Sequence, residues 1–336
     1  MDDDGAVRIE RSLPAWRASG RIAHWTAYLR SANDVARDYG ALGLALDALE
    51  GLSVGDALGE QFFLAPDHVR VAITQRWHPA PPWHWTDDTN MALSIVEVLM
   101  EHGSIEVDQL AASFARRYDP ARGYGPSMHA VLGRIDDGEP WQAVTRGQFG
   151  GQGSFGNGAA MRVAPLGAWF SEDLDRVAGE AHRSSIVTHA HEEAAAGAIA
   201  VAVAAAIAAQ GRGRPALSAG DFLEAVRARV PPSEVGERLG RAVELDSELG
   251  VERVVSKLGS GQRVSAQDTV PFALWSAAQT PDDFTETLWR TVSGLGDRDT
   301  TCAIACGVVA ARTGTDGIPP LWRASREPLP AWVTAA

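Results

Sequence analysis

Cysteine and lysine are almost missing from this sequence of 336 residues. Cys302 and Cys306 stand one helical turn apart, which indicates small buried packing residues and not a disulfide framework. Lys257 is the single lysine beside abundant arginine, a composition typical of GC-rich bacterial genomes. Aspartates fill residues 2–4, where a secretory signal needs positive charge and then an apolar core. We therefore expect a cytoplasmic protein.

Basic stripes and long membrane-spanning runs are also missing. The formal net charge is −13 and the pI is about 5.1, so the phosphate backbone of a nucleic acid is not the evident partner. The longest uncharged apolar run, residues 194–209, is alanine-rich and slightly short of a membrane span. We expect it to form a tightly packed interior helix and expect no membrane partner.

Alternating β-branched residues, the usual sign of strands, are scarce, whereas helix-periodic apolar residues recur between loops that contain glycine or proline. The pattern predicts an all-α protein without internal repeats, in which residues 211–215 form a loop and not a domain linker. We expect helices over residues 34–58, 86–102, 108–118, 126–134, 173–182, 191–209, 219–229, 233–248, 250–258, 270–278, 282–292 and 299–313.

Two acidic stretches far apart in the sequence each place two aspartates and a threonine before an apolar, helix-periodic run. They are Trp85-Thr86-Asp87-Asp88-Thr89 and Gly296-Asp297-Arg298-Asp299-Thr300. Each stretch alone has a structural explanation, because Thr86 suits an N-cap and acidic residues stabilise the first turn of a helix. The repetition of the pattern favours a functional site.

If the fold brings these stretches together, four carboxylates share one pocket. They would repel one another and stay partly protonated unless cations neutralised them, so the cluster predicts divalent metal. No cysteine or histidine lies in either stretch, which favours Mg²⁺ or Mn²⁺ over Zn²⁺. His189 and His191 are two residues apart, a spacing that argues against a two-histidine zinc site on one helix face. Each of them suits a cap, a core position or a single ligand contact.

Six glycines occupy residues 147–158, the densest glycine cluster of the chain. Such a loop lets backbone N–H groups approach a phosphate closely, and a flexible connection is the structural alternative. Gly151, Gly153 and Gly156 also fit the G-x-G-x-x-G pattern of dinucleotide-binding folds, which raises an NAD-binding oxidoreductase as a further alternative. The context disagrees with that fold, because no strand precedes the loop and Pro165 interrupts the segment after it.

Five blocks resemble, in this order, those of the ADP-ribosylglycohydrolase family, a group similar to dinitrogenase-reductase-activating glycohydrolases and ADP-ribosylserine hydrolases. They are Gly55-Asp56-Ala57-Leu58-Gly59, the first acidic stretch, Gly153-Ser154-Phe155-Gly156-Asn157-Gly158-Ala159-Ala160-Met161-Arg162, Thr188-His189 and the second acidic stretch. The resemblance implies a compact single-domain all-α fold over residues 39–328 with a central metal-binding cleft. Residues 1–38 would be an extra N-terminal segment, and residues 329–336 a C-terminal tail.

The resemblance also implies two Mg²⁺ or Mn²⁺ ions at the bottom of an ADP-ribose cleft. By position, the metal ligands would be Thr86, Asp87, Asp88, Asp297, Asp299 and Thr300. The cradle of the diphosphate and adenosine would be Gly153, Ser154, Phe155, Gly156 and Asn157, with His189 at the phosphates or distal ribose. Arg122 and the following Gly123, Tyr124 and Gly125 look like the family loop beside the distal ribose and leaving group.

Two positions depart from the family pattern. Many relatives carry a glutamate seven residues after the aspartate of Gly-Asp-x-x-Gly, where this chain has Phe63. Glu60 stands three residues earlier on a similar helix face and is therefore a candidate catalytic residue. Asp87 and Asp88 are the alternative candidates, because a metal-bound aspartate could transfer the proton instead. Arg298 replaces a residue that is commonly small, and it either alters leaving-group preference or points to solvent.

We therefore expect a monomeric, metal-dependent hydrolase that cleaves the glycosidic bond between ADP-ribose and an acceptor and so reverses ADP-ribosylation. Its partners would be an ADP-ribosylated substrate and the product ADP-ribose. The acceptor, whether protein, nucleic acid or small molecule, stays open. A catalytically silent ADP-ribose-binding module is the alternative.

Overall fold

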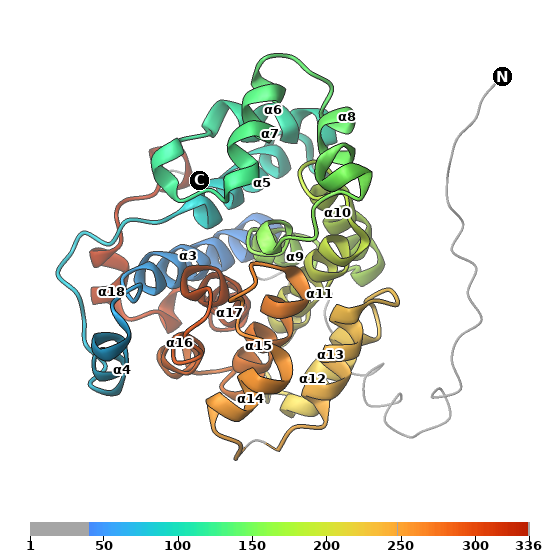
Figure 1. Ribbon diagram of the computed structural model, residues 1–336. Coiled ribbons are helices and arrows are strands. Elements are labelled where there is room, and N and C mark those ends of the chain that lie inside the picture. The colour runs from blue at the N-terminus through green and yellow to red at the C-terminus, as the bar shows by residue number, and fades with distance from the viewer. Residues whose placement is uncertain (1–39, 247, 335–336) are drawn as a thin grey trace, which may run out of the picture.

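The computed structural model describes residues 40–246 and 248–334, which form helices joined by loops (Figure 1). The α-helices are α3 (Ala41–Glu60), α4 (Pro66–Thr74), α5 (Asp87–His102), α6 (Val107–Arg117), α7 (Pro126–Asp136), α8 (Trp141–Arg146), α9 (Ala164–Trp169), α10 (Leu174–Ile186), α11 (Glu192–Gln210), α12 (Ala219–Arg227), α13 (Glu234–Val243), α14 (Val251–Leu258), α15 (Ala266–Gln279), α16 (Phe284–Val292), α17 (Arg298–Thr313), α18 (Pro320–Ser325) and α19 (Ala331–Thr334). Across these ranges extended pairing is limited to two isolated bridges, Trp83 with Arg326 and Gly156 with Ser265. The predicted all-α fold is confirmed.

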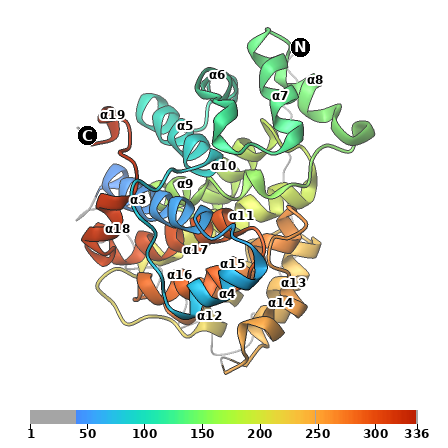
Figure 2. The ribbon, with the colours of Figure 1, turned by 60° about the vertical axis from the view of Figure 1, so that its left-hand side comes forward.

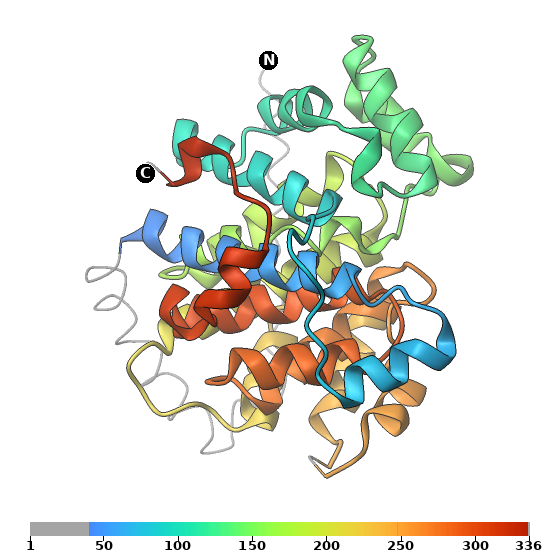
Figure 3. The same cartoon turned by 90° about the vertical axis from the view of Figure 1, so that its left-hand side faces the viewer.

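Two groups of helices lie on opposite sides of a central group. In all three views α5–α8 lie on one side, α12–α16 lie on the other, and α3, α11 and α17 run between them (Figure 1, Figure 2 and Figure 3). The two acidic stretches precede or begin α5 and α17, so one comes from the outer group and one from the central group.

Helices α3 and α17 run antiparallel and approach so closely that glycine is required between them. A Cβ atom at Gly55 would lie 2.4 Å from the Cys302 carbonyl oxygen, and one at Gly59 would lie 2.5 Å from the Arg298 carbonyl oxygen. No side chain fits at these distances, so the glycines set the separation of the two helices. Cys302 and Cys306 are buried and free, as predicted. This packing brings the end of α3 to the start of α17.

Helix α11 contains the alanine-rich run. It is long and apolar enough for a membrane span, but 89% of its most apolar window is buried inside the protein. Its small side chains allow close neighbours: a Cβ atom at Gly167 of α9 would lie 2.0 Å from the Ala202 carbonyl oxygen. The predicted interior helix is confirmed.

Proline accounts for several helices that the sequence patterns miss. Pro66, Pro165 and Pro320 lie in the first turns of α4, α9 and α18, where a missing backbone N–H costs no helical hydrogen bond. Helix α15 continues through Pro271 and begins at Ala266, four residues before the predicted start.

The chain ends are described only in part. The predicted helix over residues 34–58 begins at Ala41, and residues 34–39 lie outside the described part of the chain. The predicted N-terminal segment over residues 1–38 lies outside it too, so its role stays a prediction. Within the predicted C-terminal tail, α19 forms and Val333 is buried.

Candidate active site

Three segments meet at the candidate site: the end of α3, the start of α5 and the start of α17. Asp87 and Asp88 lie in the first turn of α5, and Asp297 directly precedes α17. Thr300 links the two acidic stretches, because its Oγ1 donates to Asp88 Oδ2 at 3.3 Å. Thr86 is the N-cap of α5, as predicted, and its hydroxyl oxygen accepts from the Asp88 N–H. Helix capping and clustering of carboxylates therefore coexist here.

The clustered carboxylates raise one another's pKa. Burial and then Asp56 raise the pKa of Asp87 to about 8. Burial and the neighbouring Asp299 raise the pKa of Asp88 well above its usual value, and burial and Asp297 do the same for Asp299. Such a cluster needs bound protons or cations at neutral pH.

Two carboxylate oxygens of the cluster lack a partner. Asp88 Oδ1 and Asp299 Oδ1 are covered from solvent and accept no hydrogen bond, although the Asp299 residue as a whole is partly exposed. Buried acceptors without a partner are rare, and aspartate and threonine oxygens are the ligands that hard divalent cations prefer. These residues therefore fit Mg²⁺ or Mn²⁺. In the described ranges no three His, Cys, Asp or Glu side chains surround one ion position, so the central metal-binding cleft stays a prediction.

The glycine-rich loop is fixed against this cluster. Asn157 Nδ2 donates to Asp297 Oδ2 at 2.6 Å and to Thr269 Oγ1 at 3.0 Å. The Phe155 carbonyl oxygen accepts from the Ala266 N–H at the start of α15. The Ser154 hydroxyl accepts from the Gly156 N–H at 3.2 Å. The contacts of Asn157 and Phe155, which join segments far apart in the sequence, disagree with a flexible connection.

His189 is buried against the same loop as a neutral imidazole. Burial and the positive charge of Arg162 lower its pKa to about 3. Its Nδ1 lies 2.8 Å from the Thr188 hydroxyl oxygen. A Cβ atom at Gly156 would lie 3.1 Å from His189 Nε2, and one at Gly158 only 2.8 Å from its Cε1. A side chain at Gly158 would therefore collide with the imidazole ring, and one at Gly156 would press against it, a reason that the sequence pattern alone did not supply.

His191 has a structural role. It is the N-cap of α11, where its Nδ1 accepts from the Glu193 N–H at 3.1 Å. Its ring meets Phe155 edge-on at a centroid distance of 5.5 Å. Of the alternatives for this histidine, the structure supports the cap.

Two exposed aromatic rings lie beside the loop. Phe149 and Phe155 are 59% and 41% exposed, and their rings stack with centroids 6.4 Å apart at 30°. Phe149 holds a φ of 51°, which a residue other than glycine seldom adopts. Large apolar rings are normally covered, so these two are candidates for contact with a planar ligand. Phe149 is not among the predicted site residues, and its only signal in the sequence is its place inside the glycine cluster.

The segment from Arg122 to Gly125 lies beside the start of α5. The Arg122 guanidinium lies 3.5 Å from the Trp85 ring centroid and donates to the Trp85 carbonyl oxygen at 2.9 Å. Gly123 has a φ of 80°, and a Cβ atom there would lie 3.9 Å from Thr86 Cβ. The buried Tyr124 hydroxyl accepts from Asn90 at 3.0 Å. The loop therefore adjoins the N-cap of α5.

Glu60 is the last residue of α3 and is partly buried. Burial, Asp56 and Asp297 all raise its pKa, which places its carboxyl in the field of the cluster. Phe63, at the family position of the glutamate, is 47% exposed and stacks under the Arg298 guanidinium at 4.9 Å. Arg298 Nε is buried without a partner, so Arg298 packs beside the site and does not simply point to solvent.

Two buried charges next to the site were missed as candidate residues. Asp56 is fully buried and accepts hydrogen bonds from Thr86, the N-cap of α5, and from Thr89 in its first turn. Arg162 is also fully buried, donates to the Ser184 carbonyl oxygen at 2.8 Å and stacks on Phe114 at 4.4 Å. Both residues stand inside the blocks that carry the family resemblance, which was the available signal.

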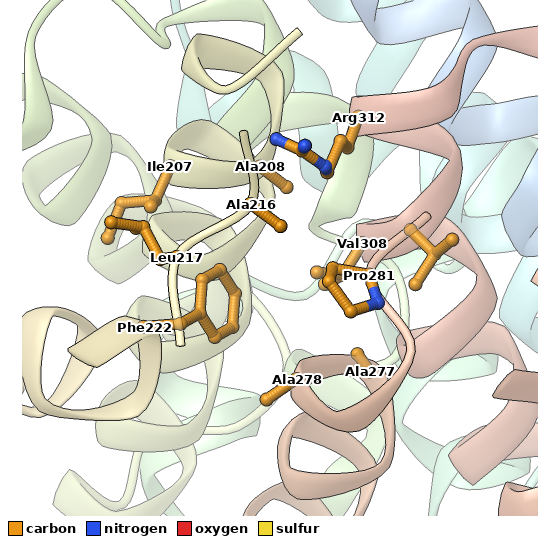
Figure 4. A pocket seen from close by; sticks show the side chains of 11 residues that line it. Ile207, Ala208, Ala216, Leu217, Phe222, Ala277, Ala278, Pro281, Val308 and Arg312 are labelled. Atoms are coloured by element: carbon orange, nitrogen blue, oxygen red, sulfur yellow. The ribbon is translucent and has the colours of Figure 1, made fainter. Parts of the chain in front are cut away.

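A separate apolar cavity lies near the C-terminal ends of α11, α15 and α17, away from the start of α17 where the carboxylates gather (Figure 4). It includes Phe222 and Pro281 and contains none of the predicted site residues. Its polar group, Arg312, already donates to Asp282 at 2.7 Å and to the Gly211 carbonyl oxygen at 2.6 Å. This cavity is therefore distinct from the carboxylate cluster.

Comparisons with known proteins agree with the resemblance. The family model described as ADP-ribosylglycohydrolase matches residues 40–335. Human ADP-ribosylhydrolase ARH3 is 32% identical over 327 residues, which cover 83% of this chain and 88% of that protein. ADP-ribosylarginine hydrolase Tri1 of Pseudomonas putida is 26% identical and covers 84% and 74%. A solved structure described as an ADP-ribosylglycohydrolase-related protein complex matches with a TM-score of 0.59 at 26% identity, covering 85% of this chain and 93% of its own.

Proposed function

Because the chain belongs to the ADP-ribosylglycohydrolase family, we propose that it is a metal-dependent hydrolase that cleaves the glycosidic bond between ADP-ribose and an acceptor. The observation that carries the proposal is the buried carboxylate cluster, in which Asp88 Oδ1 and Asp299 Oδ1 have no hydrogen-bond donor. Bound cations would give these oxygens partners and would offset the burial and the mutual repulsion that raise the pKa values of both aspartates.

Two Mg²⁺ or Mn²⁺ ions would be held by the side chains that converge from α5 and α17: Thr86, Asp87, Asp88, Asp297, Asp299 and Thr300. Bound ions would supply Lewis acidity, which lowers the pKa of water and stabilises charge at the reacting sugar. Asn157 would keep Asp297 in place through its 2.6 Å hydrogen bond, so the position of this metal ligand would depend on the conformation of the glycine loop.

The ADP-ribose moiety would lie along the glycine loop. The backbone N–H groups of Ser154, Phe155 and Asn157 would face the diphosphate, since those of Gly153 and Gly156 already donate to the Gln148 carbonyl and the Ser154 hydroxyl. The stacked rings of Phe149 and Phe155 would cover the adenine. His189, held neutral by burial, would contribute a hydrogen bond without adding charge. On the other side, the loop with Gly123, Tyr124 and Gly125 would border the distal ribose and the leaving group.

Glu60 is the proposed general acid/base. A carboxyl whose pKa is raised keeps its proton closer to neutral pH, which suits a group that protonates a leaving oxygen or nitrogen and then activates water. Asp87 and Asp88 are the other candidates for proton transfer, since burial also raises their pKa values.

A catalytically silent ADP-ribose-binding module is the second candidate. The observation in its favour is Phe63, which stands where many relatives have glutamate and stacks on Arg298. In either case we expect a cytoplasmic monomer.

The deciding experiment incubates the protein with arginine-, serine- and nucleotide-linked ADP-ribose, with and without Mg²⁺, and measures free ADP-ribose. The hydrolase predicts metal-dependent release from at least one substrate, which also identifies the acceptor. Binding of ADP-ribose without release from any substrate would favour the silent module. Absence of both ADP-ribose release and ADP-ribose binding would contradict both candidate functions.

A further inference from the structure

Asp56 contacts the candidate metal site without being available as a ligand. Both of its oxygens are occupied by donors from the start of α5. The Thr86 N–H lies 3.2 Å from Oδ1 and 3.0 Å from Oδ2, and the Thr86 hydroxyl lies 2.8 Å from Oδ1. The Thr89 N–H and hydroxyl lie 3.1 Å and 2.5 Å from Oδ2. With four donor groups on one fully buried carboxylate, no exposed lone pair is left for a cation.

These contacts make Asp56 a helix cap supplied by another helix. The first N–H groups of an α-helix have no partner within the helix and usually depend on their own N-cap residue. In α5 the N-cap Thr86 satisfies the Asp88 N–H, and Asp56 of α3 satisfies those of Thr86 and Thr89. Asp56 therefore fixes how α5, with its two aspartates, is placed against α3.

The Thr86 hydroxyl has one proton and two carboxylates within reach. Asp56 Oδ1 is 2.8 Å away and Asp88 Oδ2 is 3.2 Å away. The shorter distance favours donation to Asp56. The Thr86 oxygen then presents only lone pairs to Asp88, and two acceptors face each other. That arrangement repels unless a cation, or a proton on Asp88, lies between them.

We infer that Asp56 is a positioning residue that turns the Thr86 hydroxyl into a metal-ligating acceptor by accepting its hydrogen bond. Without Asp56 the Thr86 hydroxyl would donate to Asp88 Oδ2, which already accepts from Thr300, and this second internal donor would weaken the hold of that carboxylate on a cation. The inference rests on the proposed metal-dependent function and adds to it a residue that acts through Thr86. Residues that orient metal ligands in this way typically contribute about 10–100-fold in metal affinity.

The test is a Mn²⁺ titration followed by the paramagnetic resonance signal of free Mn²⁺, with melting of the metal-free proteins measured in parallel. Asp56→Asn keeps the shape but places an amide donor against N–H and O–H donors. We expect its Mn²⁺ affinity to fall by about 10–100-fold. Thr89→Val is the matched control, because it removes the other hydroxyl that donates a hydrogen bond to Asp56 and leaves Thr86 in place. Its Mn²⁺ affinity should stay within about threefold of wild type, even if the metal-free protein melts earlier.

A double-mutant cycle tests whether Asp56 acts through Thr86. If it does, Thr86→Val removes the effect, and adding Asp56→Asn to it changes Mn²⁺ affinity little further. Additive losses would overturn the inference, as would wild-type affinity in Asp56→Asn or equal losses in Asp56→Asn and Thr89→Val. If Asp56→Asn does not fold, Asp56→Ser takes its place in the cycle. The required result is then a tenfold or larger loss in Asp56→Ser that adds little to the loss in Thr86→Val, and additive losses would reject the inference. Absence of Mn²⁺ binding by the wild type would instead overturn the proposed function together with this inference.

Discussion

The buried imidazole of His189 should make the protein lose stability in mild acid, and His189→Gln should reduce that loss. Burial lowers the pKa of this group from 6.5 to about 3 in the folded protein, mainly because a charged ring would lose its hydration. Between these two values the unfolded chain binds a proton that the folded protein excludes. Stability therefore rises with pH across this window and is lost as the pH falls.

The size of the effect depends on the width of that window. Each pH unit below 6.5 costs about 1.4 kcal/mol, so this histidine alone should cost about 2 kcal/mol at pH 5. The aspartates with raised pKa values act in the opposite direction, because in the metal-free folded protein they bind protons more readily than in the unfolded chain. Both proteins contain these aspartates. Subtracting the pH-dependent change in unfolding free energy of His189→Gln from that of wild type therefore cancels their contribution.

The assay is urea unfolding of the metal-free proteins at pH 7 and pH 5. Wild type should lose about 2 kcal/mol more than His189→Gln between the two conditions. An equal change in both proteins would refute the reasoning, since it would mean that the ring is protonated as easily inside the protein as outside.

Three further predictions concern the site. Asp299→Ala should abolish turnover and weaken Mn²⁺ binding in calorimetry, because it removes a candidate ligand and leaves its acidic neighbours uncompensated; undiminished metal binding would contradict this. Glu60→Gln should lose about two to four orders of magnitude in turnover with ADP-ribose and metal affinity near wild type, and wild-type turnover would transfer the proton-transfer role to Asp87 or Asp88. Gly156→Val should lower ADP-ribose affinity in a folded protein, since its side chain would enter space beside the His189 ring, and unchanged affinity would leave the loop a purely structural role.

The sequence was most informative where local chemistry and tertiary structure agree. Thr86 caps α5, and the apolar residues after the second acidic stretch form α17, because capping and helical periodicity are both local signals. The alanine-rich run became an interior helix for the same reason. Proline was the main source of error: Pro165 was interpreted as an interruption, yet it lies in the first turn of α9.

Contacts between distant segments were not predictable from spacing. Nothing local to Asp56 indicates that its hydrogen bonds come from Thr86 and Thr89 of another helix. The need for Gly158 was also hidden, because the ring that excludes a side chain there belongs to His189. The family resemblance identified these blocks as important, and the structure supplies the physical reason for particular residues in them.

The most direct test of the proposed function is release of ADP-ribose by protein that has been exhaustively chelated and then resupplied with metal. We predict no release by the chelated protein from the best of the three acceptor-linked substrates, full recovery on addition of Mg²⁺ or Mn²⁺, and no recovery in Asp299→Ala. Equal release before and after chelation, or full activity of Asp299→Ala, would contradict a metal-dependent hydrolase at this site.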